Sequence, residues 1–153
     1  MPSEVKWIED GPASKRLKID NWRKLRDRLL VMNGNFSMPT WLQMDRAGET
    51  ASEALEPACG TSACLAGTAY LVERAEKRPD ARFRRKIPSQ DTVRRAAERW
   101  LGLQCGEGSH VFGGRWAYGS IHGVTRTRAI AYVNQVIETS NVYWREGVIN
   151  DQD

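Results

Sequence analysis

The sequence of 153 residues has no apolar run close to the roughly 20 residues that a membrane-spanning helix needs. Its first residues also lack the hydrophobic stretch typical of a signal peptide. Cysteine is scarce, with three residues, and an odd number without a secretory signal favours reduced thiols over a disulfide framework. We therefore expect a cytoplasmic protein without a membrane partner.

Histidine is scarcer than cysteine, with only His110 and His122. The glycine-rich segment 102–123 matches neither GxxxxGK[ST] nor a GxGxxG that follows a strand. These are the sequence signatures of backbone loops that bind nucleotide phosphates. We therefore expect no nucleotide cofactor, and no other cofactor is indicated.

The chain is long enough for one domain with a substantial hydrophobic core. Residues 1–19 mix charges with Pro2, Gly11 and Pro12 and show no periodicity, which predicts a flexible or loosely docked N-terminal arm. Residues 20–144 are expected to form a single helical domain, and residues 145–153 a tail.

Apolar residues at helical spacing recur in four stretches. The first follows Asp20 and Asn21, the second covers about 61–77, the third runs from Ser89 to Gly102, and the last begins at Thr125. The sequence therefore predicts an all-α fold, a compact bundle of about four helices around a central helix at about 61–77. Segment 102–123 holds seven glycines and is expected to form a loop or a short β-hairpin.

The most unusual stretch runs from Ala58 to Tyr70 and begins the central helix. Its small residues and two cysteines form a compact motif of Cys59, Gly60, Thr61, Cys64, Ala66 and Gly67. Glycine inside a helix costs about 1 kcal/mol relative to alanine. We therefore expect the backbone of a neighbouring segment to approach Gly67 closely.

Several blocks in this order resemble a group of small phage and bacterial proteins of unassigned function with a CGTxxCxAG motif. The blocks are Trp22-x-x-Leu25-x-x-x-Leu29, Phe36-x-Met38-x-x-Trp41, Cys59-Gly60-Thr61-x-x-Cys64-x-Ala66-Gly67, Ala96-x-x-x-Trp100-Leu101-Gly102-Leu103, Val111-Phe112 and the Thr125 helix that leads to Asn141-Val142-Tyr143-Trp144. The resemblance covers roughly residues 20–144. It implies a mostly helical fold and a phage origin, and it implies no activity. Thr68 departs from it, because such proteins are expected to have Trp or His there.

One chemical hypothesis is a cysteine-dependent hydrolase with Cys59 as the nucleophile. A thiolate near a helix N-terminus is stabilised by free backbone N–H groups and by the helix dipole. His110 or His122 would be the base. The segments after Cys59 nevertheless read as helices, whereas papain-like peptidases place a sheet with the histidine there. Buried structural thiols are the competing interpretation, and we commit to no catalytic residue.

A zinc site is the second chemical hypothesis. Cys59, Cys64, His110 and His122 are four acceptable ligand types. The two histidines are twelve residues apart, so the usual pair of closely spaced ligands is missing. We therefore expect no metal.

Basic side chains are concentrated between residues 77 and 99. This segment holds nine basic and three acidic residues, a net charge of +6 in a chain whose total is +4. Its expected binding surface consists of Arg82, Arg84, Arg85, Lys86, Arg94, Arg95 and Arg99. Such a patch suits an acidic partner, although a solvated helix face would look the same.

The leading hypothesis is a non-enzymatic interaction protein, phage-encoded, that binds a host or defence protein or complex through this Arg-rich surface. The alternative is a nucleic-acid-binding module that uses the 77–99 segment. In that alternative Phe83 and Trp116 are available to stack on bases.

Overall fold

The computed structural model describes residues 5–12, 14, 16–32, 36–56 and 61–147. Within these residues the chain is mostly helical, as predicted, but it is not all-α, since it has four short strands, and it has six α-helices instead of about four. The α-helices are α1 (Ile19–Val31), α2 (Ala51–Ala54), α3 (Leu65–Lys77), α4 (Gln90–Leu101), α5 (Cys105–Phe112) and α6 (Arg126–Thr139). A 3-10 helix covers Ile121–Gly123. The strands are β1 (Trp7–Glu9), β2 (Leu42–Gln43), β3 (Ser62–Ala63) and β4 (Trp144–Glu146).

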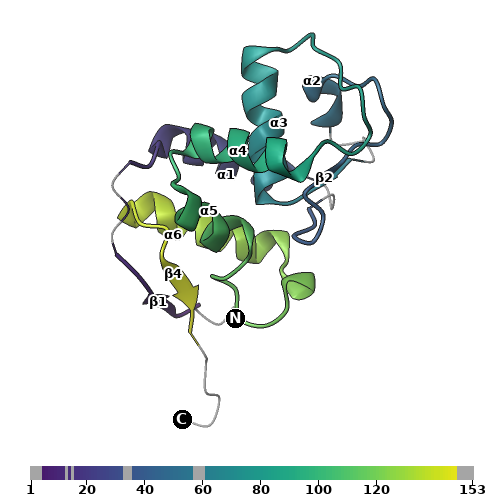
Figure 1. The fold of residues 1–153 in the computed structure, drawn as a ribbon. Coiled ribbons are helices and arrows are strands. Elements are labelled where there is room, and N and C mark those ends of the chain that lie inside the picture. The colour runs from purple at the N-terminus through teal and green to yellow at the C-terminus, as the bar shows by residue number, and fades with distance from the viewer. Residues whose placement is uncertain (1–4, 13, 15, 33–35, 57–60, 148–153) are drawn as a thin grey trace.

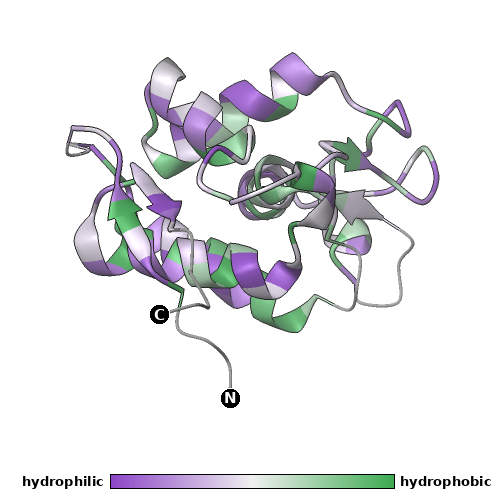
Figure 2. Ribbon diagram, turned by 90° about the horizontal axis from the view of Figure 1, so that it is seen from below, coloured by the Kyte–Doolittle hydropathy of each residue, from purple (hydrophilic) through white to green (hydrophobic). Residues whose placement is uncertain are grey.

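Helix α3 lies at the centre and contacts α1, α2, α4 and α5. All seven residues from Leu65 to Leu71 are buried, because other elements pack against this helix on several sides. Figure 2 looks along α3, which is upright in Figure 1, and shows it surrounded by the other elements. The helix begins four residues later than predicted, because Ser62 and Ala63 form β3 and pair with β2.

Helices α1 and α4 meet at the C-terminal end of α4. The indole N–H of Trp22 donates to the carbonyl of Leu101 at 3.0 Å, and the amide of Asn21 donates to the carbonyl of Trp100 at 2.7 Å. These bonds satisfy carbonyls that a helix end leaves without internal partners. Gly102 ends α4 with a φ of 76°, a left-handed conformation in which glycine commonly ends a helix.

The glycine-rich segment is not a β-hairpin. Its first half is helix α5, with Val111 and Phe112 buried in the last turn. A capping box at the start of α5 offsets the low helix propensity of the glycines, since Gln104 and Glu107 each bond the backbone of the other. The later part turns around Trp116, which is fully buried and donates to the carbonyl of Val111 at 2.9 Å.

The segments expected to be an arm and a tail pair with each other. Strand β1 is antiparallel to β4, with Ile8 opposite Arg145. Trp7 packs near Tyr132 of α6 with ring centroids 6.0 Å apart, so this ribbon covers one side of α6 (Figure 1). Among the described helices, none has both the length and the apolarity that crossing a membrane requires.

Candidate functional site

Cys59 and Gly60 of the cysteine motif lie outside the described residues. The other four members lie where the segment 36–44 packs on the start of α3. Thr61, Cys64 and Ala66 are buried, and the backbone N–H of Ser37 donates to the carbonyl of Ala63 at 2.9 Å. Within the described residues, the motif packs the segment 36–44 tightly against the start of α3.

Gly67 permits the closest contact of this junction. A Cβ atom at this position would overlap with the carbonyl oxygen of Trp41. The same oxygen faces the backbone N–H of Cys64 at 3.4 Å and its thiol at 3.5 Å. The predicted close backbone approach at Gly67 is confirmed.

The thiol of Cys64 lacks the properties of a nucleophile. Cys64 is the N-cap residue of α3, yet its side chain makes no capping hydrogen bond. Burial raises the pKa of the Cys64 thiol to about 11, an effect that the nearby backbone N–H groups offset only in part. The thiol therefore stays protonated at neutral pH.

We expect Cys64 to resist alkylation in the folded protein. With a pKa near 11, only about one thiol in ten thousand is a thiolate at pH 7. Native protein treated with iodoacetamide at pH 7, then digested and analysed by peptide mass, should carry no label at Cys64. The same treatment in guanidinium should label it fully. Labelling of native Cys64 at the unfolded rate would contradict this burial.

His110 is engaged in the hydrophobic core near β4. Its Nε2 lies 2.9 Å from the carbonyl oxygen of Trp144, and because a carbonyl only accepts, Nε2 carries the proton. The rings of Tyr132 and Tyr143 pack beside it, with centroids 6.4 and 5.3 Å away. Burial lowers the pKa of His110. These contacts support a structural role for this histidine.

His122 lies apart from that core, exposed in the 3-10 helix. The described residues contain no group of three or more His, Cys, Asp or Glu side chains that could hold a metal. The four proposed zinc ligands are thus not brought together within the part that the structure describes, and Cys59 lies outside it.

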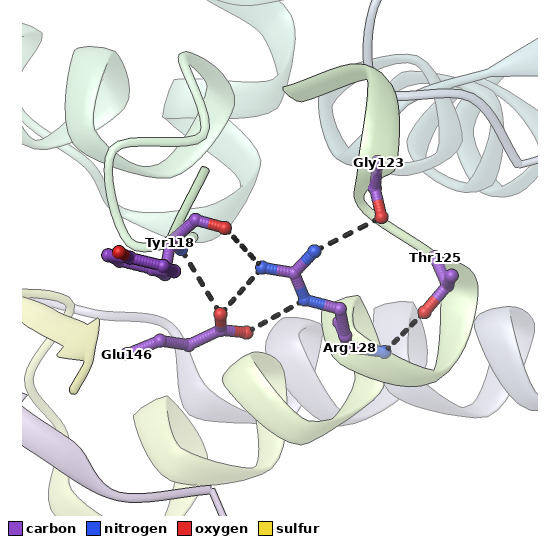
Figure 3. A network of polar contacts seen from close by, with 5 residues as sticks. All are labelled: Tyr118, Gly123, Thr125, Arg128 and Glu146. Carbon is purple, nitrogen blue, oxygen red and sulfur yellow. Dashed lines mark hydrogen bonds and ion pairs between the residues drawn. The ribbon is translucent and has the colours of Figure 1, made fainter. Parts of the chain in front are cut away.

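Arg128 and Glu146 form a partly buried network that joins α6, β4 and the loop before α6 (Figure 3). The guanidinium binds both carboxylate oxygens, Nε at 3.1 Å and Nη2 at 2.6 Å. It also donates to the carbonyls of Gly123 and Tyr118. Hydrogen bonding to Glu146 raises the pKa of Arg128. The sequence analysis did not identify this pair, whose partners are 18 residues apart.

The seven basic residues of the expected binding surface fall into two groups, according to whether their side chains have partners. Arg94 and Arg95 of α4 pair with Asp91, at 2.9 and 3.1 Å, and Arg82 binds the carbonyl of Gly48 at 2.8 Å. Four others are exposed, and their side chains have no hydrogen-bond or ion-pair partner among the described residues. These are Arg84, Arg85, Lys86 and Arg99.

Three of these free cations lie in one segment, residues 82–87, which we name the basic loop. The backbone holds this loop at both ends. The N–H of Phe83 donates to the carbonyl of Glu49 at 2.9 Å, and the carbonyl of Lys86 accepts from Met44 at 2.8 Å. Ile87 is 59% exposed at its end. The loop therefore presents cations and one apolar side chain on a fixed backbone.

Both aromatic residues predicted to stack on bases are buried. Phe83 packs under the guanidinium of Arg74, 4.6 Å from its ring centroid, and beside Tyr70. Trp116 stacks on Tyr132 inside the core at 4.5 Å. The stacking role assigned to them is wrong, because neither ring face is accessible.

The sequence analysis also missed a cleft of about 340 Å³ between α3 and α4. Its lining comes from Tyr70, Glu73, Arg74 and Lys77 of α3, from Arg78, and from Thr92, Ala96 and Arg99 of α4. The sequence feature that could have indicated this cleft is the spacing of these residues by three and four positions, which places them on one face of each helix.

Comparison with models of protein families, with curated proteins and with solved structures finds no match to this chain.

Proposed function

We propose that the protein is a non-enzymatic binding protein whose basic loop docks on an acidic surface of a partner protein. The observation that carries this proposal is the set of exposed cations, Arg84, Arg85 and Lys86, which have no partner within the described residues. Charges without internal partners remain free to meet an opposite charge on another molecule. The resemblance to phage proteins suggests a host or defence protein as the partner.

The fixed backbone of the basic loop supports this proposal. A loop whose conformation is already set loses less conformational entropy on binding than a flexible one. Ile87 adds an exposed apolar contact beside the cations. Cations next to a hydrophobic anchor suit a protein surface, where hot spots combine apolar burial with charge pairing.

Binding of nucleic acid is the second candidate, and it has less support. The same cations could contact phosphates. However, the rings of Phe83 and Trp116 are buried, and Arg94 and Arg95 share Asp91. Base stacking by these rings is thereby lost, and a phosphate would have to compete with Asp91 for Arg94 and Arg95.

Site-specific photo-crosslinking tests the proposal. A benzoyl-phenylalanine at Ile87 should crosslink a discrete protein in an extract of the cells that express the gene, through a peptide with net negative charge. Arg84→Glu combined with Arg85→Glu should lower the yield at least about tenfold, because two attractive contacts become repulsive. The yield should also fall as salt is raised.

The matched probe position is Tyr118, which is 60% exposed and whose backbone contacts Arg128 and Glu146 rather than the basic loop. Its photo-crosslinking should not recover the same protein. Arg23→Glu with Arg115→Glu changes the net charge equally and should leave the yield at position 87 unchanged. Recovery of nuclease-sensitive nucleic acid at position 87 would instead establish the second candidate, and equal yields at both positions would refute a docking role for the loop.

A further inference from the structure

The cleft between α3 and α4 is a concave site with strongly basic walls. Arg74 and Lys77 come from the last turn of α3, Arg78 follows as its C-cap residue, and Arg99 comes from α4. Against these four cations the lining has one carboxylate, Glu73. That carboxylate is already neutralised by Lys77 at 3.2 Å. The cleft therefore keeps an excess of positive charge.

The three arginines of the cleft have no carboxylate within ion-pair distance in the described part of the chain. This contrasts with Arg94 and Arg95 on the same helix α4, which both reach Asp91. Like charges that share one concave surface repel each other, and a bound anion relieves that repulsion.

Arg74 is held in place independently of any ligand. Its guanidinium lies over the ring of Phe83, and its Nη1 donates to the hydroxyl of Tyr70 at 3.3 Å. A fixed guanidinium loses little side-chain entropy when it binds an anion. Arg78 and Arg99 are exposed and remain free to close on a ligand.

We propose that this cleft binds a small phosphorylated molecule. Guanidinium groups match the oxygens of phosphate through paired N–H donors, and Thr92 adds a hydroxyl donor. A volume of about 340 Å³ is at the lower end of the roughly 300–1,000 Å³ of small-molecule sites, which favours a compact ligand over a dinucleotide. The C-terminal dipole of α3 opposes an anion, so binding depends on the arginines.

Titration with pyrophosphate tests this site, with thermal unfolding and calorimetry as readouts. Pyrophosphate should raise the Tm of the protein in a saturable manner, and chloride at matched ionic strength should not. Arg78→Gln combined with Arg99→Gln should weaken the affinity at least about tenfold. Both side chains are exposed, so this variant should fold, and circular dichroism checks that it does.

The control variant is Arg84→Gln with Arg85→Gln, which removes the same charge from the basic loop and should keep the affinity. Equal weakening in both variants, or an equal effect of chloride, would overturn the site in favour of general attraction by a basic protein. Inorganic phosphate and ATP as parallel titrants identify the preferred source of the phosphate. The proposal does not rest on the docking function, so failure of the photo-crosslinking at Ile87 leaves it standing.

Discussion

Substitution of Gly67 by alanine is expected to lower the free energy of unfolding by about 3 kcal/mol, or roughly 10 °C in Tm. The new Cβ would overlap with the carbonyl oxygen of Trp41, which is backbone and cannot rotate away. The segment 36–44 must move off α3, and β2 would lose its register with β3. The gain in helix propensity, about 1 kcal/mol, is too small to compensate. Urea unfolding followed by circular dichroism measures the change.

Gly106 in α5 provides the matched control. A Cβ there would meet only the hydroxyl of Tyr143, at 3.9 Å, which is ordinary contact. Gly106→Ala should therefore be neutral or stabilise the protein by up to about 1 kcal/mol. Equal effects at both positions would show that Trp41 does not approach α3 as closely as the structure indicates.

Substitution of Arg128 by alanine is expected to destabilise the protein by about 3 kcal/mol. It removes four hydrogen bonds and leaves Glu146, which is only 8% exposed, without its cation. Arg128→Lys should be intermediate, because lysine restores the charge but cannot bind two carboxylate oxygens and two carbonyls in one plane. Chemical unfolding of the three proteins measures the order.

Arg126 is the matched control, since it lies in the first turn of the same helix and has no ion pair in the part of the chain that the structure describes. Arg126→Ala should change stability by less than about 0.5 kcal/mol. A double-mutant cycle of Arg128→Ala with Glu146→Gln should show strong coupling. Additive effects would mean that the two side chains do not act as a pair.

The longer helices were predictable because their apolar residues recur at helical spacing. Trp22, Leu25 and Leu29 of α1 are all buried, as their periodicity indicates. Val93 and Trp100 of α4 are buried in the same way. The residues at two helix ends were equally predictable. Gly102 ends α4 in the left-handed conformation, and the side chain of Thr125 caps α6 by accepting a hydrogen bond from the backbone N–H of Arg128.

Helix α5 and the strands were not predictable, for two different physical reasons. The glycines of α5 lower its helix propensity, and only the Gln104–Glu107 capping box marked its start. Strands β1 and β4 have three residues each and are defined by their pairing with each other, which no local pattern encodes. Helix α3 begins later than predicted because Ser62 and Ala63 are extended and pair with β2.

The candidate sites were predictable only in part. Arg84, Arg85 and Lys86 could be expected on the surface, because a charged run is rarely buried. Arg94 and Arg95 differ from them because both form ion pairs with Asp91. The sequence places Asp91 within reach on the same helix but does not show that these pairs form. Phe83 was predicted to be available for stacking, but Tyr70 and Arg74 of α3 pack against its ring and bury it.

The β1–β4 ribbon also sets the order in which the chain can fold during synthesis. Its two strands lie more than 130 residues apart in sequence, and closing so long a loop carries a high entropic cost. Helices α1, α3 and α4 can pack as soon as they leave the ribosome, because their contacts span shorter stretches. Strand β1 must wait for Trp144–Glu146, so Trp7 and the surface of α6 beneath it stay uncovered until β4 has been synthesised.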